Sequence, residues 1–338
     1  MQILGLSNQS SGCGYHRILL PLAYMQGVKA YVTNWITEDK MEGWDVINYN
    51  RLCPYDGDWS GFRKLMNYPK IVMDIDDYWI LPPNHINAIQ YAGHTPKIIA
   101  NLQDADAVTT TNARLAEKVY KYNKNVYILP NALPYGVNQF HDGKIESDKT
   151  RVIWVGGSSH TADIELLRNP LKKMRGQNVQ MVVGGYTNTD EYSRLIWDRM
   201  ASSLTAGGQL DHIKLPGRMP TDYMDLYQFG DIALIPLEKS EWHACKSNLK
   251  LLEAAAKNIP CIVSNVEPYN NDYDCPAFFV NSQKDWARFL TMLINDKNLI
   301  YEYGKALKAW AEQSYNYESI NHQRYNIFTN LCQAQALL

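Results

Sequence analysis

Short apolar runs alternate along the chain with longer stretches that have helical periodicity. The short runs predict buried strands at residues 2–7, 29–33, 45–50, 70–76, 107–111 and 125–131, and again at 151–157, 179–185, 212–217, 231–237, 261–265 and 277–281. Stretches such as 15–27 and 112–124 predict helices between them. Strands that alternate with helices favour parallel sheets covered by helices on both faces.

A segment rich in proline, glycine, asparagine and charge, residues 132–149, predicts a linker between two such sheets. The length of 338 residues also favours two domains. We therefore expect an α/β protein with two Rossmann-like, doubly wound parallel-sheet domains, at residues 1–140 and 150–310, facing a cleft. A helical tail at 311–338 is expected to pack back on the first domain. Ligands of such sheets bind at the carboxyl ends of the strands.

Composition and charge limit the partners and the cellular location that we expect. The formal net charge of −2 gives no overall attraction to nucleic acid or anionic membrane, so a polyanionic partner would need a local patch. No secretory signal and no run of about 20 apolar residues is present, which predicts a cytoplasmic protein without stable membrane insertion. Scattered cysteines without CxxC spacing predict free thiols in a reducing compartment: Cys13, Cys53, Cys245, Cys261, Cys275 and Cys332.

The stretch HACKSNLKLLEAAAKNIP, residues 243–260, predicts a helix that begins near Ser247 and follows the strand at 231–237. Unpaired backbone N–H groups at such a helix start bind anions, and Lys246, Ser247, Asn248 and Lys250 lie beside it. Lys246 and Glu253 would lie two turns apart, roughly 10 Å, on one face. That span suits a diphosphate at one end and a ribose at the other, although a solvated face with a Lys250–Glu253 ion pair explains the pattern as well.

The turn WVGGSSH, residues 154–160, follows the first strand of the second half. Gly156 and Gly157 allow close approach of a phosphate, and Ser158 and His160 lie where a capped helix begins. We count these four residues as candidate donor-binding residues. A plain strand-to-helix turn is the alternative.

The loop after the first strand, SNQSSGCGYHR, contains Gly12 and Gly14 and leads into a helix with His16 and Arg17 at its start. Arg17 is a candidate bidentate clamp for a phosphate, and His16 is a candidate acid or base. A packed or surface histidine is the alternative for His16.

The run VMDIDDYW ends a strongly apolar strand with Asp74, Asp76 and Asp77. Strand alternation directs Asp74 and Asp76 to one face and Asp77 to the other. Carboxylates at this end of a strand are candidates for a general base or for hydroxyl recognition, and helix capping is the alternative. No further acids or histidines follow at tight spacing, so no metal site is predicted.

These pieces in this order resemble the GT-B glycosyltransferases, specifically glycosyltransferase family 4, most closely over residues 215–269. By this resemblance, Glu253, in the family's E-A-x-A-x-x-x-P context, holds the ribose of a nucleotide-sugar. The segment with Pro130 and Asn131 resembles the family's interdomain PNG element, with Ala132 in place of the glycine. The chain is also similar to a divergent branch encoded by phages.

Two departures from the family affect the expected site. The family's first glutamate, eight positions before the second, is Cys245 here. The family's arginine and lysine after the first strand of the nucleotide domain are absent, because that turn reads GGSSHTAD. Lys246, Lys250, Arg218 or Arg17 would then have to neutralise the diphosphate.

The resemblance implies metal-independent transfer of a hexose or pentose from a nucleotide diphosphate-sugar, such as a UDP-sugar, with retained configuration and no cofactor. The acceptor would meet Asp76, Asp77 and His16, which are the candidate catalytic residues. It could be a glycan, a lipid-linked glycan, a protein or a modified base in viral DNA, in the host cytoplasm for a viral protein. Basic stretches from Arg114 to Lys124 and from Arg168 to Arg175 keep the DNA alternative open.

Other functions remain open at this point. A GT-B epimerase would need catalytic carboxylates and no second substrate. A non-catalytic nucleotide-sugar or glycan-binding protein would explain Cys245. A dinucleotide oxidoreductase is disfavoured, because neither half carries a GxGxxG motif after its first strand.

Overall fold

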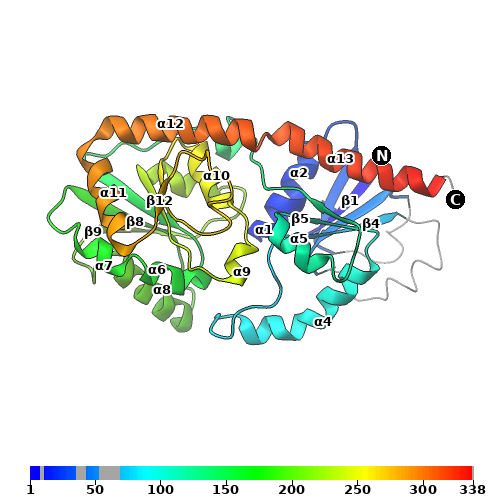
Figure 1. Ribbon diagram of the computed structural model, residues 1–338, viewed down its shortest axis with the longest axis horizontal. Helices are drawn as coiled ribbons and strands as arrows, with labels where there is room; N and C mark the ends of the chain where they lie inside the picture. Colours follow the sequence, from blue (N-terminus) through cyan, green and yellow to red (C-terminus); the bar gives the residue numbers. More distant parts are fainter. Residues whose placement is uncertain (8–10, 36–42, 53–68, 337–338) are drawn as a thin grey trace. The chain divides into compact units, whose positions relative to one another are not determined.

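Two parallel sheets of six strands each organise the chain (Figure 1). The computed structural model describes residues 1–7, 11–35, 43–52 and 69–336. The first sheet has the order β2-β1-β3-β4-β5-β6, with strands β1 (Gln2–Leu6), β2 (Lys29–Thr33), β3 (Val46–Asn50), β4 (Lys70–Ile75), β5 (Ala107–Thr110) and β6 (Val126–Ile128). The second has the order β12-β11-β10-β7-β8-β9, with β7 (Thr150–Val155), β8 (Val179–Tyr186), β9 (Asp211–Pro216), β10 (Ile232–Ile235), β11 (Cys261–Ser264) and β12 (Phe278–Val280). The predicted α/β fold with two parallel sheets is confirmed.

The chain divides into two units that do not follow a single boundary. Unit 1 contains Met1–Asn131, Ala244–Ser247 and Tyr317–Leu338, and unit 2 contains Ala132–His243 and Asn248–Asn316. The boundary that the sequence predicts at residue 140 therefore differs from this division. Residues 132–140 belong to unit 2, where the Gln139 side chain donates to the carbonyl of Pro220 at 2.8 Å and accepts from the amide of Met224 at 3.0 Å.

The first sheet of unit 1 separates two apolar layers, because successive side chains of a strand point to opposite faces. Ile3, Val46 and Val72 pack with Ile18 and Phe328 on one face. On the other face, residues one position further along the same strands pack with α4 and α5. The helices of unit 1 are α1 (Gly12–Gly14), the π-helix η1 (Tyr15–Leu19), α2 (Leu20–Ala23), α4 (Ala88–Asp104), α5 (Ala113–Val119) and α13 (Tyr317–Ala336).

The last helix, α13, is part of unit 1 although it ends the chain. The Tyr317 hydroxyl donates to the carbonyl of Leu20 at 2.8 Å, and the Asn321 amide donates to the carbonyl of Pro21 at 2.9 Å. Helix α5 ends at Val119, so the basic stretch from Arg114 to Lys124 does not form the continuous helical stripe that the sequence suggested.

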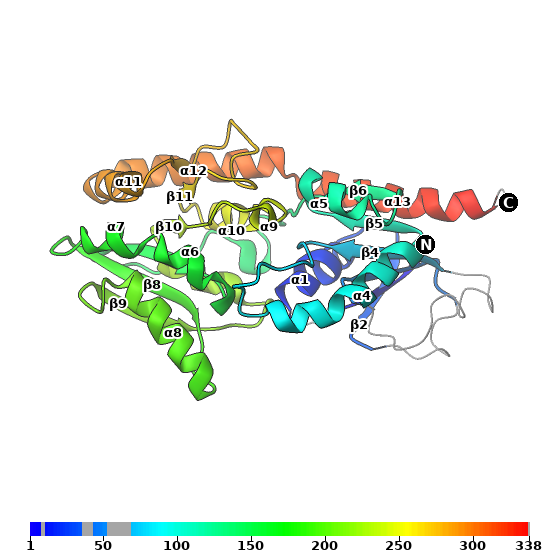
Figure 2. The same ribbon diagram turned by 60° about the horizontal axis from the view of Figure 1, so that its bottom comes forward.

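Unit 2 carries helices on both faces of its sheet, with α8 and α12 on opposite sides (Figure 2). Its helices are η3 (Asn138–Phe140), η4 (Ser158–His160), α6 (Thr161–Glu165), α7 (Arg168–Lys172), α8 (Glu191–Leu204), η5 (Tyr223–Phe229), α9 (Glu241–Ala244), α10 (Leu249–Ala256), α11 (Gln283–Asn295) and α12 (Lys297–Ser314). The last residue of α9, Ala244, already belongs to unit 1. Trp154, Trp197 and Trp286 lie in the apolar core that packs α8 and α11 against the sheet.

Two further sequence expectations can be compared with the structure. None of the five described cysteines forms a disulfide, and Cys53 lies outside the described residues. Within the described part of the chain, no helix combines the length and the apolar character that crossing a bilayer requires.

Candidate active site

The second sheet changes direction between β7 and β10, which are adjacent although two strands separate them in the sequence. In an open parallel sheet, the connections that follow two such strands leave toward opposite faces and open a crevice at their carboxyl ends. The Gly156–Gly157 turn follows β7, and the segment that leads to α10 follows β10. The topology therefore brings two of the predicted donor-binding segments to the same edge.

Lys250 lies at this glycine turn. Its ammonium donates to the carbonyl of Val155 at 2.6 Å and lies 5.8 Å from the centre of the Trp154 ring. A Cβ at Gly156 would lie 2.7 Å from Trp154 and 3.1 Å from the Lys250 nitrogen, so glycine is required for this approach. The sequence predicted Gly156, Gly157 and Lys250 separately, and the structure places them together.

Ser158 and His160 form the short helix η4 rather than the cap of a long one. The carbonyl of Ser158 accepts from the Thr161 hydroxyl at 2.7 Å, and no side-chain hydrogen bond caps η4. The Nδ1 of His160 lies 2.8 Å from a carboxylate oxygen of Asp163. His160 is thus positioned by an acidic partner three residues later in the chain.

Asp163 is a buried carboxylate that the sequence analysis missed. It accepts the amide of Glu238 at 2.8 Å and lies 3.5 Å from the Nε2 of His243, whose Nδ1 lies 2.9 Å from the Ser240 hydroxyl. Burial acts to raise its pKa, but the hydrogen bond and charge of His160 and the charge of His243 lower it below its usual value. Asp163 therefore ties the turn after β7 to the segment after β10. Its position three residues after His160 was the available sequence signal.

Glu253 lies in the interior of unit 2 with 4% of its surface exposed. Its carboxylate accepts the Tyr227 hydroxyl at 2.9 Å. Burial raises its pKa, while the charge of Lys250 and the hydrogen bond from Tyr227 act in the opposite direction. The carboxylate is thus protected from bulk water and has a polar partner.

The sequence prediction that Lys246 and Glu253 share one helix face is wrong. Helix α10 begins at Leu249 with Asn248 as its N-cap residue, and Asn248 makes no side-chain capping bond. Lys246 precedes the helix and belongs to unit 1, where its carbonyl accepts the Asn112 side chain at 2.7 Å.

The residues next to Lys246 in the sequence also pack with unit 1. The Ser247 hydroxyl accepts from the Asn131 amide at 2.9 Å. Cys245, at the place of the family's first glutamate, is fully buried in the core between the first sheet and helices α4 and α5. These residues thus pack with unit 1, whereas Asn248, Lys250 and Glu253 belong to unit 2.

Arg218 lies on the segment after β9 and faces two acids. Its guanidinium lies 3.3 Å from Asp222 and 3.6 Å from Asp225, and 39% of its side chain is exposed. Two carboxylates therefore already balance its charge.

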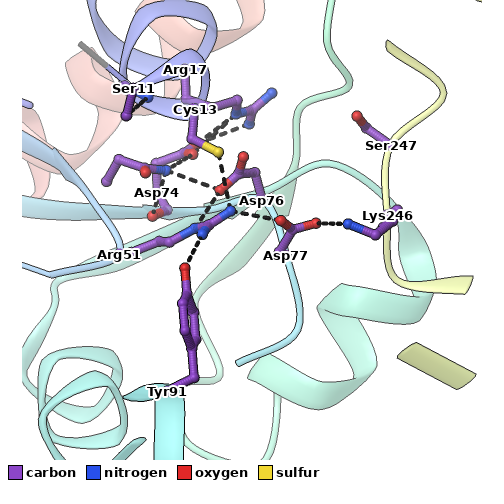
Figure 3. A network of polar contacts seen from close by, with 12 residues as sticks. Ser11, Cys13, Arg17, Arg51, Asp74, Asp76, Asp77, Tyr91, Lys246 and Ser247 are labelled. Atoms are coloured by element: carbon purple, nitrogen blue, oxygen red, sulfur yellow. Dashed lines mark hydrogen bonds and ion pairs between the residues drawn. The ribbon is translucent and has the colours of Figure 1, made fainter. Parts of the chain in front are cut away.

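In unit 1, the sheet changes direction between β1 and β3, and polar side chains gather after β1, β3 and β4 (Figure 3). Gly12 and Gly14 form the first helical turn after β1, and the Ser11 hydroxyl caps it by accepting from the amide of Gly14 at 2.9 Å. This turn sets the start of the helix that carries His16 and Arg17.

Arg17, which the sequence predicts as a phosphate clamp, uses its guanidinium for contacts inside unit 1. The side chain is 1% exposed and pairs with Asp74, with nitrogen to oxygen distances of 2.8–3.2 Å. Its remaining bonds go to the carbonyl of Leu129 at 2.9 Å and to the side chain of Asn131 at 3.0 Å. Arg17 and Asp74 form a buried ion pair, and Arg17 thereby links β4 to the segment that follows β6.

Arg51, which the sequence analysis missed, holds the two candidate carboxylates. It donates to Asp76 at 2.9 Å, to Asp77 at 2.7 Å and to the Tyr91 hydroxyl at 2.6 Å (Figure 3). Lys246 adds a second cation 3.4 Å from Asp77. Asp76 and Asp77 therefore contact one guanidinium, although strand alternation predicted opposite faces. Arg51 has a φ of 58°, a conformation uncommon for a residue with a side chain.

The charges in this cluster set the state of its titratable groups. Burial acts to raise the pKa of Asp76, but Arg51 and the hydrogen bond from the Cys13 thiol hold it well below its usual range. Burial lowers the pKa of His16 to about 4, and the charge of Arg17 adds to this effect while Asp76 opposes it. At neutral pH, Asp76 is ionised and His16 is neutral.

Cys13, Asp76 and Asp77 offer one ligand atom each within 4.8 Å of one another, as a metal site would. The Arg51 guanidinium donates to all three, with 3.1 Å to the sulfur, and therefore occupies the place of a cation. Burial raises the pKa of the Cys13 thiol, so it stays protonated rather than becoming a thiolate ligand. These three groups fit an ion-pair network better than a metal centre.

Comparisons with known proteins agree with this architecture. Residues 149–296 match the sequence model of the family "Glycosyl transferases group 1". Sucrose-phosphate synthase from Thermosynechococcus elongatus has a similar structure, with a TM-score of 0.70 and 14% identity over 99% of this chain and 100% of that one.

Two further structures show the same architecture. A glycosyltransferase from Rickettsia africae gives a TM-score of 0.63 and 12% identity, over 98% of each chain. HepE from Anabaena, solved with UDP-glucose, gives 0.65 and 11% over the full length of both chains. A search of curated proteins found no sequence relative. At these identities the likeness shows the fold, which is the GT-B fold. The stretch that matches the glycosyl transferases group 1 model makes up most of unit 2.

Proposed function

We propose that this protein is a glycosyltransferase that moves a sugar from a nucleotide diphosphate-sugar to an acceptor hydroxyl. The observation that carries the proposal is that the segment matching glycosyl transferases group 1 contains Lys250 at the Gly156–Gly157 turn and the buried carboxylate of Glu253. HepE, a neighbour with the same fold, has been solved with UDP-glucose, which supports a UDP-sugar as the donor.

In this proposal, unit 2 holds the donor. Glu253 accepts hydroxyl groups of the ribose, as its hydrogen bond from the Tyr227 hydroxyl already illustrates. Lys250 and the backbone N–H groups of the glycine turn neutralise the charge that develops on the departing diphosphate, and fixed donors at such a point accelerate transfer. This arrangement supports a mechanism without a metal ion and without a further cofactor.

The acceptor is proposed to meet the Asp76–Asp77 cluster of unit 1. Both carboxylates have oxygens that can accept hydrogen bonds from a sugar or nucleoside hydroxyl, and Arg51 fixes their orientation. His16, which is buried and neutral at pH 7, adds a group that can take up a proton. Acceptors with vicinal hydroxyls fit this cluster. Such acceptors include glycans, lipid-linked glycans and hydroxylated bases of viral DNA. In this proposal the transferred sugar retains its configuration, as in the family that the sequence resembles.

The test measures nucleotide binding and turnover together. Glu253→Gln should weaken UDP binding in calorimetry by about tenfold, because a charge-assisted hydrogen bond contributes about 1.5–3 kcal/mol. Glu191→Gln is the matched control, since this carboxylate is 82% exposed on α8. Release of UDP from UDP-sugars is then followed with a panel of glycan and nucleoside acceptors. Equal UDP affinity of wild type and Glu253→Gln would remove the ribose role.

A non-catalytic nucleotide-sugar-binding protein is the second candidate, and Cys245 favours it. The family's first glutamate would contact the transferred sugar, whereas the Cys245 side chain is buried in the core of unit 1. Turnover separates the two candidates. UDP binding without product, across all donors and acceptors in the panel, would favour the binding protein, and any acceptor-dependent product would exclude it.

A further inference from the structure

A cavity of about 730 Å³ in unit 2 lies at the amino ends of the second sheet, away from the glycine turn. Thr150, the first residue of β7, lines it, and so do Asp231 and Asn258, which precede β10 and β11. The proposed donor site lies at the carboxyl ends of the same strands. The cavity is therefore separate from that site, and its size is in the range of small-ligand sites.

Lysines converge on this cavity from three parts of the chain. The loop before β7, the end of α10 and one face of α12 supply Lys144, Lys149, Lys257, Lys297, Lys305 and Lys308. Four carboxylates also line it, so the lining carries a formal excess of two positive charges in a protein whose net charge is −2. A concave surface of one sign concentrates small ions of the opposite sign.

Ion pairs explain three of these lysines. Lys144 pairs with Asp231, Lys149 with Asp211 at 2.6 Å, and Lys308 with Asp142 at 3.6 Å. Among the described residues, neither Lys297 nor Lys305 forms an ion pair with a carboxylate. Two lysines without an ion pair therefore lie on the α12 side of the cavity.

Lys257 is the innermost lysine, with 4% of its surface exposed. Its ammonium donates to the carbonyls of Gln139 and His141 at 2.8 and 2.7 Å, and no carboxylate in the described part of the chain forms an ion pair with it. Burial lowers its pKa to about 8, Asp225 and Asp142 oppose this shift, and Lys308 adds to it. An anion in the cavity would stabilise its charged form.

One face of helix α12 lines the cavity with three lysines and a tyrosine. Lys297, Tyr301, Lys305 and Lys308 recur at spacings of four, four and three residues, which places them on one helix face. Tyr301 is 64% exposed, and the Lys305 ammonium donates to its hydroxyl at 3.2 Å and lies 5.1 Å from the centre of its ring. An exposed aromatic ring between cations offers an apolar surface to the C–H face of a sugar, next to charges that bind its anionic group.

The position of Lys297 is also unfavourable for folding. It is the first residue of α12, where the helix dipole favours negative side chains and a cation is destabilising. A binding role accounts for a lysine at this position better than helix stability does.

We propose that this cavity is a second binding site, for a saccharide that carries a phosphate or carboxylate group. The site does not depend on the proposed transfer reaction. Lys297, Lys305 and Lys257 bind the anionic group, and Tyr301 contacts the sugar ring.

The experiment is calorimetric titration of the full chain with glucose 6-phosphate, glucuronate, glucose and inorganic phosphate, with and without excess UDP. We expect at least one of the two anionic sugars to bind more tightly than glucose and inorganic phosphate, with an affinity that UDP does not change. The variant Lys297→Glu/Lys305→Glu should weaken this binding by at least about tenfold, because it reverses two charges close to the ligand. Lys172→Glu/Lys173→Glu, on and just after α7, is the matched control and should change the affinity less than about twofold.

Two further measurements keep the test decisive. Lys297→Glu should leave the midpoint of thermal unfolding unchanged or raised, since it suits the helix start, so lost binding cannot be attributed to misfolding. Tyr301→Ala should weaken binding of the anionic sugar and leave that of inorganic phosphate unchanged. The proposal is overturned by no binding of either anionic sugar, by competition with UDP, by unchanged affinity in the double variant, or by inorganic phosphate binding as tightly as both sugars.

Discussion

Replacing Arg17 with methionine tests whether this arginine is part of the core of unit 1 or part of a ligand site. Methionine keeps most of the length and apolar volume of the side chain and removes only the guanidinium. The change leaves Asp74, which is 1% exposed, without its ion-pair partner. A buried carboxylate that loses its partner is strongly destabilising, because water does not replace the lost interactions.

The structure sets the size of the expected effect. Breaking a buried ion pair typically costs about 3–5 kcal/mol. Asp74 keeps two donors, the Thr109 hydroxyl at 2.6 Å and the Asn50 amide at 3.2 Å. Arg324 also lies near Asp74. Burial lowers the pKa of Arg324 to about 10, and the charge of Asp74 opposes this shift. These remaining interactions place Arg17→Met at the lower end, at about 3 kcal/mol of lost unfolding free energy.

The assay is urea unfolding followed by circular dichroism, with UDP affinity measured on the same variant. Arg17→Met/Asp74→Asn should recover part of the loss, because no unpaired charge remains in the double variant. Arg114→Met, which removes a 53% exposed arginine that lies 3.8 Å from Glu117, is the control and should change stability by less than about 1 kcal/mol. A stable Arg17→Met protein that no longer binds UDP would refute the reasoning and restore the phosphate role.

Three further predictions address the two units. Lys250→Met should weaken UDP binding by about tenfold and leave uridine binding nearly unchanged, because its amine lies at the proposed diphosphate position; equal losses for both ligands would contradict this. Gly185→Ala should destabilise the protein by about 2 kcal/mol or more, since its φ is +96° and a Cβ would lie 2.3 Å from the carbonyl of Gly156. Gly207→Ala, with a φ of +74° and open space around it, should lose only about 1–2 kcal/mol, and a larger loss than Gly185→Ala would reverse the argument. The pKa of His16 lies near 4 when folded and near 6.5 when unfolded, so its contribution to stability is present above pH 6.5 and is lost as the pH falls toward 4. His16→Gln should therefore remove about 3 kcal/mol of pH dependence in that window, measured by urea unfolding, and parallel pH profiles would exclude a buried neutral His16.

The strands were predictable because parallel strands buried on both faces read as continuous apolar runs. All twelve predicted strand segments correspond to strands of the two sheets. The first and last residues of helices were harder to predict from the sequence, as α5 and α10 illustrate. The basic residues after Val119 continue a helical spacing that the backbone itself does not continue.

The charge partners were not predictable, because they depend on which strands are neighbours. Arg51 follows β3 and its carboxylates follow β4, and only the adjacency of these strands brings them within 2.7–2.9 Å. Arg17 looked like a phosphate ligand for the same reason. Its position after β1 is visible in the sequence, but the Asp74 that neutralises it lies 57 residues later.

The segment Ala244–Ser247 shows most clearly that neighbours in the sequence need not belong to the same unit of the fold. Its neighbours on both sides belong to unit 2, yet Cys245 is fully buried in the core of unit 1 and Lys246 pairs with Asp77 of that unit. Restoring the resembling family's glutamate at position 245 would bury a carboxylate among apolar side chains, at a cost of several kcal/mol without a partner. The cysteine is therefore matched to its packing, and a search for the group that contacts the transferred sugar should begin with residues whose side chains are not committed to that core.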